Sequence, residues 1–298
     1  MSGRGTDRMY DDEQAVDAAL VRRLLARRFP TWSNRRIVPV QGSGTVNVIY
    51  RLGDDLAVRL PRRTEGADGI AREQHWLPIL APLLPVAVPE VVGVGNPTTD
   101  FPHQWSVVRW LDGTNPDPDR LGDPESLALR IAEVVRAFRR IERTDAPTAH
   151  RGGPLAPQDA ATRDAITRLP EDIDAAAVTA VWDETLRVPE WQREPVWLHA
   201  DLMPGNLLVR NEQLSAVLDF GTVGVGDPAC DLMVAWNLLP PGLRPTFREA
   251  VDVDDDTWLR GRGRALSMSV IALPYYQNSN RSFAANARHV IREVLAVA

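Results

Sequence analysis

The chain of 298 residues contains no lysine, so all 34 of its basic residues are arginine, an absence that codon bias explains more simply than function. Its single cysteine, Cys230, excludes an intrachain disulfide and a cysteine zinc cluster. No run reaches the roughly 18 apolar residues that a membrane-spanning helix needs. The N-terminal stretch MSGRGTDRMYDDEQAV also lacks the apolar core of a signal sequence. These absences predict a cytoplasmic protein without a membrane partner.

The composition is otherwise that of an ordinary globular protein, with 44% hydrophobic and 25% charged residues. The net charge of −6 disfavours a nucleic-acid partner, and the chain shows neither a basic stripe nor a stacking motif. The acidity mildly favours a cationic small molecule, although solubility alone is the simpler account. We expect a monomer or a homodimer.

The first third of the sequence contains two helical segments and several short β-rich runs. Apolar residues at helical spacing predict a helix over residues 13–29, which Pro30 closes. The runs IVPV, TVNVIYRL and DLAVRL, residues 37–60, predict strands joined by tight turns. GADGIAREQHWL predicts a helix that ends before Pro78, and EVVGVG and QWSVVRWL predict two further strands.

The pattern becomes mainly helical after Asp112-Gly113. Asp123 and Pro124 predict a helix start, and an apolar stripe follows as far as Ile141. Residues 145–170 are rich in Pro, Gly and polar residues and predict a loop or insertion. A short β region and two helical stripes, over 257–273 and 283–297, complete the chain. We expect an α+β fold with a β-rich N-lobe, residues 1–110, and a larger helical C-lobe, residues 111–298, with the ligand between them.

The strongest chemical signal is HADLMPGN, residues 199–206, followed by LDFG, residues 218–221. Phosphoryl transfer needs one carboxylate at the acceptor hydroxyl, and Asp201 is the candidate catalytic base. It also needs oxygen ligands for Mg²⁺, for which Asn206 and Asp219 are the candidates. Apolar runs flank a polar turn between these two residues, so a hairpin would bring them to one end.

Simpler interpretations exist for the same residues. His199 and Asp201 could be local loop residues and Asp219 a turn cap, but the combined spacing and order of both motifs argue against chance. A metal hydrolase built on His199, Asp201, Asp219 and Asp227 needs more histidine ligands than this region offers. The acidic groups at 112–119 and 252–256 could attract a cationic acceptor, but helix capping is the simpler account of the second.

The segments VWLHADLMPGNLLV and AVLDFGTVGVGDPACDL closely resemble the aminoglycoside phosphotransferase family, which are bacterial small-molecule kinases with a protein-kinase-like fold. The resemblance extends more weakly over most of the chain. Members usually have glycine at the position of Ala200 and histidine at that of Met203. The resemblance implies that Asp227 and Asp231 brace the catalytic loop, although a capping role explains Asp227 equally well.

The resemblance implies a two-lobed, protein-kinase-like enzyme that transfers the γ-phosphoryl group of ATP or GTP to a hydroxyl of a small molecule, with Mg²⁺ as cofactor. An aminoglycoside-like antibiotic is the namesake acceptor, which would make the protein an antibiotic-resistance enzyme. Two alternatives stay open: a kinase of a small metabolite such as an amino alcohol or sugar, and a nucleotide-binding regulator without transferase activity.

The stretch LAVRLPRR, residues 56–63, stands where a kinase-like fold has its third strand. That strand normally carries a lysine that pairs with the α- and β-phosphates and with a glutamate of a helix. Arg59 stands at the lysine position, and a guanidinium can bind phosphate and carboxylate in bidentate fashion. Glu73 is the candidate partner, and Glu65 is the second choice.

Two further segments are candidates for nucleotide contacts. Residues 41–45 lie where a phosphate-covering turn would be, with donors or close-approach positions at Gly42, Ser43, Gly44 and Thr45. WSVVRWLDG would link the lobes, and the resemblance implies that main-chain groups from Arg109 to Leu111 meet the purine edge.

Overall fold

The computed structural model describes residues 16–40 and 46–296. The chain divides into two compact units. The first contains Met1–Pro82, Ala87–Gly113 and Ala216–Gly221, and the second contains Leu83–Val86, Thr114–Ser215 and Thr222–Ala298. The segment Ala216–Gly221 therefore packs with the first unit, although it is distant from the rest of that unit in the sequence.

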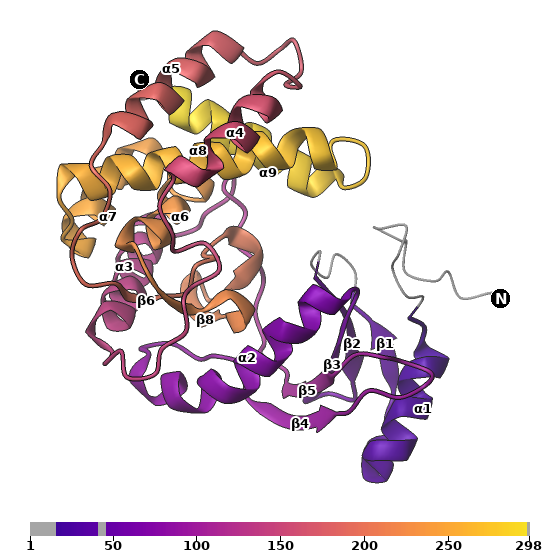
Figure 1. The fold of residues 1–298 in the computed structure, drawn as a ribbon. Helices are drawn as coiled ribbons and strands as arrows, with labels where there is room; N and C mark the ends of the chain where they lie inside the picture. Colours follow the sequence, from indigo (N-terminus) through magenta and orange to yellow (C-terminus); the bar gives the residue numbers. More distant parts are fainter. Residues whose placement is uncertain (1–15, 41–45, 297–298) are drawn as a thin grey trace. The chain divides into compact units, whose positions relative to one another are not determined.

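The first unit is built on a five-stranded antiparallel sheet with the order β1-β2-β3-β5-β4 (Figure 1). The β-rich runs of the sequence form these strands, and β3 lies at the centre with all six of its residues buried. Since all six residues of this strand are buried, both of its faces are covered, which explains the nearly continuous apolar run in LAVRL. The strands are β1 Ile37–Pro39, β2 Asn47–Leu52, β3 Leu56–Pro61, β4 Val91–Gly95 and β5 Trp105–Arg109.

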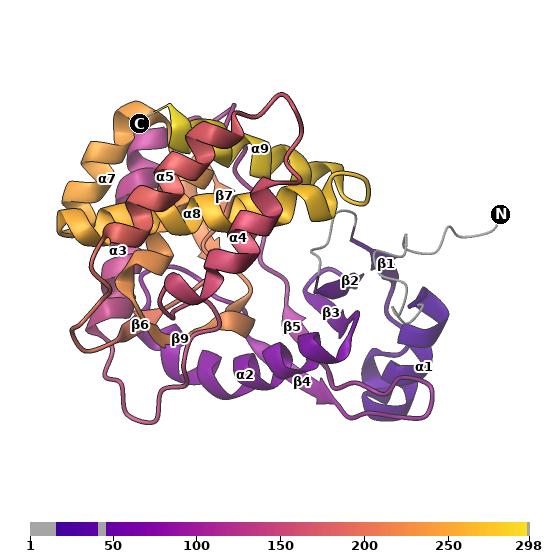
Figure 2. The ribbon, with the colours of Figure 1, turned by 45° about the horizontal axis from the view of Figure 1, so that its top comes forward.

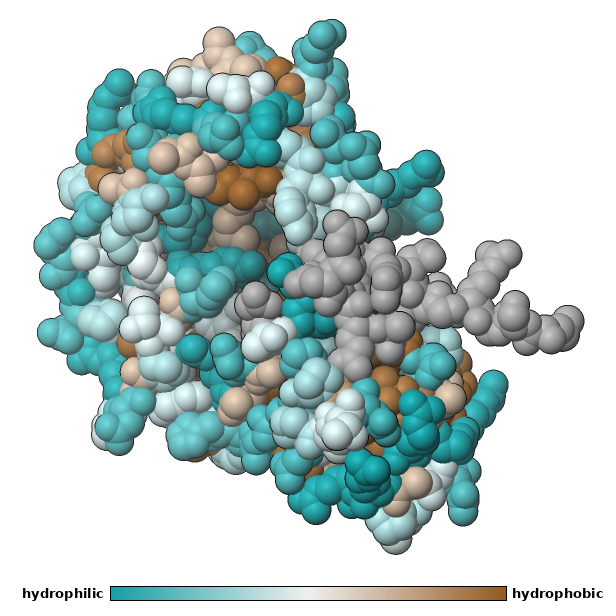
Figure 3. Space-filling model, turned by 45° about the vertical axis from the view of Figure 1, so that its right-hand side comes forward, coloured by the Kyte–Doolittle hydropathy of each residue, from teal (hydrophilic) through white to brown (hydrophobic). Residues whose placement is uncertain are grey.

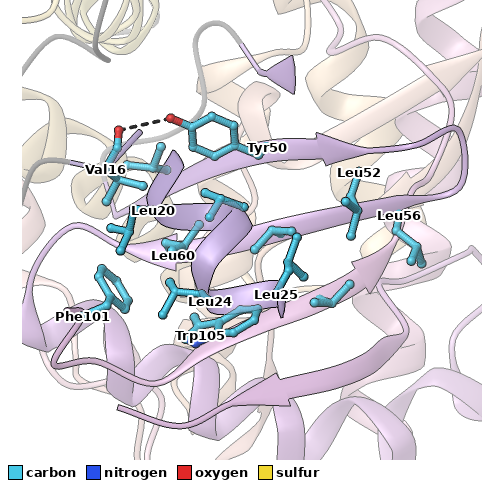
Figure 4. Close-up of a cluster of buried hydrophobic side chains, with 14 residues drawn as sticks. Val16, Leu20, Leu24, Leu25, Tyr50, Leu52, Leu56, Leu60, Phe101 and Trp105 are labelled. Carbon is cyan, nitrogen blue, oxygen red and sulfur yellow. Dashed lines mark hydrogen bonds between the residues drawn. The ribbon is translucent and has the colours of Figure 1, made fainter. Parts of the chain in front are cut away.

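The helix α1, Ala18–Arg28, contributes Leu20, Val21, Leu24 and Leu25 to the core of the first unit. It begins after Asp17, whose carboxylate accepts a hydrogen bond from the N–H of Leu20 at 2.7 Å. Its buried leucines pack against side chains of the sheet (Figure 4). The hydroxyl of Tyr50 donates to the carbonyl of Val16 at 3.1 Å and fixes the start of the helix to β2.

The helix α2 spans Thr64–Leu80 and contains Pro78, so the prediction that it ends before this proline is wrong. Pro78 stands in the last turn, where a missing N–H removes one intrahelical hydrogen bond. Leu77 and Leu80 on either side of it are buried. The apolar area that these side chains bury explains why the last turn forms.

The second unit is mainly helical (Figures 1 and 2). The predicted helices are present, and the two longest C-terminal helices, α8 and α9, lie side by side in both views. Asp254 caps α8 by accepting a hydrogen bond from the N–H of Thr257 at 2.8 Å, which confirms the capping interpretation of the acidic run. The helices are α3 Pro124–Arg140, α4 Asp159–Ile166, α5 Ala175–Arg187, α6 Val234–Asn237, α7 Arg244–Val251, α8 Asp255–Tyr276 and α9 Arg281–Leu295.

The β region of the second half forms two small two-stranded sheets, one pairing β6 with β9 and the other β7 with β8. Four short strands take part: β6 Val196–Leu198, β7 Leu207–Arg210, β8 Gln213–Val217 and β9 Gly224–Gly226. The candidate motifs HADLMPGN and LDFG occupy the connections from β6 to β7 and from β8 to β9.

The segment 145–170 is not simply a loop, since it contains the short 3₁₀ helix η3, Ala156–Gln158, and α4. Thr162, Ala165 and Ile166 of α4 are buried. The carboxylate of Asp159 accepts a hydrogen bond from the indole N–H of Trp182 on α5 at 2.8 Å. These contacts come from residues that are distant in the sequence, so the local composition could not predict the helix.

No helix in the described part of the chain is long and apolar enough to cross a membrane. Hydrophilic side chains cover most of the face shown in Figure 3, and hydrophobic ones form only small patches. The large exposed hydrophobic side chains among the described residues are Val38, Val46, Ile79, Leu83, Leu129, Ile271 and Tyr275.

Candidate active site

The residues that the sequence singles out lie in both units. Arg59, Glu73 and Asp219 belong to the first unit, whereas Asp201 and Asn206 belong to the second. The turn residues Gly42, Ser43, Gly44 and Thr45 lie outside the described residues. The side chain of Glu65, within α2, is also outside them.

Arg59 lies in the middle of β3, opposite Ile49 of β2 and Ser106 of β5, with 7% of its surface exposed. Its guanidinium forms an ion pair with Glu73, which α2 supplies and which is 1% exposed. The second terminal nitrogen of Arg59 lies 3.6 Å from a carboxylate oxygen of Asp219. One planar guanidinium therefore joins the helix carboxylate to the aspartate of LDFG, which a single ammonium would do less readily.

Glu73 also holds the LDFG segment through the backbone. Its second carboxylate oxygen accepts a hydrogen bond from the N–H of Phe220 at 2.8 Å. One turn earlier on α2, an added Cβ at Gly69 would lie 3.4 Å from the Cα of Gly221. Conversely, a Cβ at Gly221 would lie 3.1 Å from the Cα of Gly69, so the two backbones approach each other at positions where neither residue has a side chain.

The charges of this cluster depend on one another. Burial lowers the pKa of Arg59, but the carboxylates of Glu73 and Asp219 outweigh burial and hold the pKa above its ordinary value. Burial raises the pKa of Glu73, Asp219 adds to the rise, and Arg59 and the N–H of Phe220 oppose it. Removal of the guanidinium would leave a buried carboxylate without its counter-charge.

The linker candidates Arg109 and Leu111 lie at and beyond the end of β5. The N–H of Arg109 donates to the carbonyl of Glu90, and that of Trp110 donates to the carbonyl of Asp55, both at 2.9 Å. The Arg109 side chain pairs with the carboxylate of Glu90 at 2.8 Å. Two N–H groups of this stretch are thus already bonded within the first unit.

In the second unit, the loop from His199 to Asn206 holds its own polar side chains together. The amide nitrogen of Asn206 donates to the main-chain carbonyl and to a carboxylate oxygen of Asp201, both at 2.9 Å. Asn115 fixes the end of this loop by donating to the carbonyls of Gly205 at 2.9 Å and Leu207 at 2.8 Å. Because the amide nitrogen of Asn206 faces Asp201, its amide oxygen is the atom available to a cation.

The other carboxylate oxygen of Asp201 forms an ion pair with Arg151. The sequence analysis missed this residue. Arg151 lies in the segment that the composition assigned to a loop, and no motif links it to a position 50 residues later.

Asp231 holds the backbone immediately before the candidate base. Its carboxylate, which is fully buried, accepts hydrogen bonds from the N–H of His199 at 2.9 Å and from that of Ala200 at 2.8 Å. Burial raises the pKa of Asp231. The rise is opposed by the His199 side chain, by the two backbone hydrogen bonds from His199 and Ala200, and by the charge of Arg139. The His199 ring itself is buried and packs edge-on to Phe138.

Ala200 has a φ of 64°, in the left-handed region where glycine is favoured. We expect Ala200→Gly to raise the free energy of unfolding by up to about 1 kcal/mol, because relief of the Cβ strain exceeds the entropy cost of glycine. Urea denaturation measures the change. Ala128→Gly, inside α3, is the matched control and should lower the free energy by about 1 kcal/mol or more. Equal losses in both variants would show that Ala200 is not strained.

Of the two roles that the sequence left open for Asp227, the structure shows the cap. Asp227 caps the 3₁₀ helix η6, Pro228–Met233, by accepting a hydrogen bond from the N–H of Ala229 at 2.9 Å. It also receives two hydrogen bonds from the buried Arg260 of α8, at 2.7 and 3.2 Å. Asp227 therefore joins the segment after LDFG to the helical core.

Cys230 lies between these two aspartates and is fully buried, and burial raises the pKa of its thiol to about 12. A rise of this size reduces the thiolate fraction near pH 8 on the order of a thousandfold. We expect native protein to resist iodoacetamide and to react with one equivalent after denaturation in urea, as measured by mass spectrometry. Rapid labelling of the native protein would contradict this burial.

Among residues 16–40 and 46–296, no group of three or more His, Cys, Asp or Glu side chains is placed to hold a metal ion.

Comparisons with known proteins identify the family and the fold. The family model described as "Phosphotransferase enzyme family" matches residues 37–266. No curated protein matches the chain. Solved structures of similar fold include the GDP complex of wild-type aminoglycoside 2'-phosphotransferase-IIIa, with a TM-score of 0.76 and 19% identity over 95% of this chain and 99% of that one.

Two further structures show the range of this fold. The GDP and kanamycin complex of APH(2")-IIIa matches with a TM-score of 0.73 and 19% identity over 92% of this chain and 98% of that one. The macrolide 2'-phosphotransferase of Brachybacterium faecium matches with a TM-score of 0.60 and 22% identity over 92% and 97%. The α+β fold, with its five-stranded sheet and helical second part, is that of these kinase-like enzymes. Since the family model covers most of the chain, the protein belongs to the phosphotransferase enzyme family that includes the aminoglycoside phosphotransferases.

Proposed function

We propose that this phosphotransferase moves the γ-phosphoryl group of ATP or GTP to a hydroxyl of a small molecule. The observation that carries the proposal is the oriented carboxylate of Asp201, which Asn206 holds inside the spacing H-x-D-x-x-x-x-N. The ion-pair cluster of Arg59, Glu73 and Asp219 supports the proposal, because these residues are the candidates for binding the phosphates of the nucleotide.

Asp201 would accept the proton of the acceptor hydroxyl as the oxygen of that hydroxyl bonds to the γ-phosphorus. The bond from this phosphorus to the β,γ-bridging oxygen breaks at the same time, and the nucleoside diphosphate leaves with the electron pair. Arg59, held by Glu73, would bind α- and β-phosphate oxygens. The amide oxygen of Asn206 and the carboxylate of Asp219 suit Mg²⁺, which would neutralise charge on the phosphates.

The solved structures of similar fold support a proposal for the acceptor class. Solved structures of this fold include complexes with kanamycin and gentamicin, and macrolide 2'-phosphotransferases. We propose a hydroxyl-rich antibiotic of the aminoglycoside or macrolide type as acceptor. Amino alcohols and sugars are the alternative.

The test is a panel of these acceptors with Mg²⁺ and either ATP or GTP, in which nucleotide consumption and the mass of the product are measured. We expect acceptor-dependent consumption and a product heavier by one phosphoryl group. A thermal-shift screen with a non-hydrolysable nucleotide narrows the panel, since a ligand at about 100 times its Kd stabilises the fold by roughly 2.7 kcal/mol. Nucleotide binding without consumption for any acceptor would favour a regulator instead.

Arg59→Lys tests whether the arginine is specifically required. A lysine can keep the pair with Glu73 but not the second contact with Asp219. We expect a loss of about 1 kcal/mol in the free energy of unfolding and a rise of roughly tenfold in the KM for nucleotide. Arg23→Lys, at an exposed position of α1, is the matched control. A lysine variant that binds nucleotide as tightly as the wild type would show that the arginine is incidental.

A further inference from the structure

The candidate base is held from two sides. Asn206 donates to one carboxylate oxygen of Asp201 at 2.9 Å, and the guanidinium of Arg151 pairs with the other. The side chain of Asp201 is only 15% exposed and that of Arg151 31%. Solvent therefore screens this pair less than it screens a surface ion pair.

The backbone that carries Arg151 is itself fixed by the core. Arg264 of α8, 1% exposed, donates to the carbonyls of Arg151 and Gly153, both at 2.6 Å. Between them, the carbonyl of Gly152 accepts a hydrogen bond from the N–H of Asp227 at 2.9 Å. An added Cβ at Gly152 would lie 3.0 Å from the Cα of Gly226, so this loop also packs directly on β9.

The last torsion angle of an aspartate side chain has a broad energy minimum. The direction of the carboxylate lone pairs therefore depends on the hydrogen-bond partners of the two oxygens. With each oxygen held by a different donor, the plane of the Asp201 carboxylate is fixed. A general base is effective only when it lies within hydrogen-bond reach of the proton that it accepts. The positive charge of Arg151 also offsets the repulsion between this carboxylate and an incoming triphosphate.

We propose that Arg151 is a positioning residue for phosphoryl transfer, acting through Asp201 by fixing the orientation and balancing the charge of its carboxylate. This inference rests on the proposed function of Asp201 as base.

The test compares Arg151→Met, Arg151→Lys and the control Arg168→Met, an exposed arginine paired with Asp164 on α4. We expect Arg151→Met to lower kcat by about 10- to 100-fold with little change in the KM values or Tm. Arg151→Lys should recover part of the loss, and methylguanidinium should restore part of kcat in Arg151→Ala. The control should match the wild type.

A double-mutant comparison separates positioning from a general structural role. In the Asp201→Asn background, Arg151→Met should cause no further loss of kcat, because the partner is already inactive. An equal fold-loss in both backgrounds, or a wild-type kcat in Arg151→Met, would overturn the inference and leave the proposed function standing. A wild-type protein that phosphorylates no acceptor would overturn the proposed function, and the inference with it.

Discussion

Asp201→Asn is expected to lower kcat by about 10²- to 10⁴-fold, because an amide has almost the same shape as the carboxylate but cannot accept the proton of the acceptor. The KM for nucleotide should change little, since the contacts proposed for the phosphates come from other residues. The variant should also remain folded, because Asn206 and the backbone still hold the loop.

The measurement is steady-state transfer with the best acceptor from the panel, and circular dichroism verifies the fold. Asp164→Asn is the matched control, because this aspartate is exposed and pairs with Arg168, four residues later. Near wild-type kcat in Asp201→Asn would remove Asp201 from the mechanism.

The largest effect on stability is expected from Asp231→Ala. This variant leaves two buried N–H groups, those of His199 and Ala200, without their acceptor. Each unsatisfied buried donor costs about 1–3 kcal/mol, so the free energy of unfolding should fall by roughly 3 kcal/mol or more. The left-handed backbone of Ala200 would lose its support at the same time, so kcat should also fall.

Urea denaturation of Asp231→Ala measures this loss, and Asp256→Ala is the control. Asp256 is exposed in the first turn of α8, where removing a carboxylate costs about 0.3–1 kcal/mol. Asp231→Asn should not rescue the variant, because its NH₂ group would face one of the two N–H donors. A loss below about 1 kcal/mol in Asp231→Ala would show that water or backbone can replace the carboxylate.

Local patterns predicted the strands of the first unit and the helices α1, α3, α8 and α9. The β-rich run DLAVRL predicted β3, and the apolar stripes over 257–273 and 283–297 predicted α8 and α9. Prediction from local patterns failed where tertiary packing determines the secondary structure. Pro78 continues a helix because buried leucines flank it, and α4 forms in a segment whose composition favours a loop.

The motif residues of the candidate site were identified from spacing, but their partners were not all visible. Glu73 was found because a helix follows the strand of Arg59 closely in the sequence, and the structure places the two together. Arg151 and Arg264 could not be found, because their contacts join positions 50 and 113 residues apart. Neither hydrophobic periodicity nor a sequence motif predicts a contact between side chains so far apart in the sequence.

We propose that Asn206 and Asp219 bind one magnesium ion at the tail of a bound triphosphate. A crystal structure with Mg²⁺ and a non-hydrolysable ATP or GTP analogue tests it most directly. The account predicts Mg²⁺ at about 2.0–2.1 Å from the amide oxygen of Asn206 and from the carboxylate of Asp219. A bound nucleotide whose magnesium contacts neither residue, with Asp201 and Asp219 on separate faces of the protein, would contradict it.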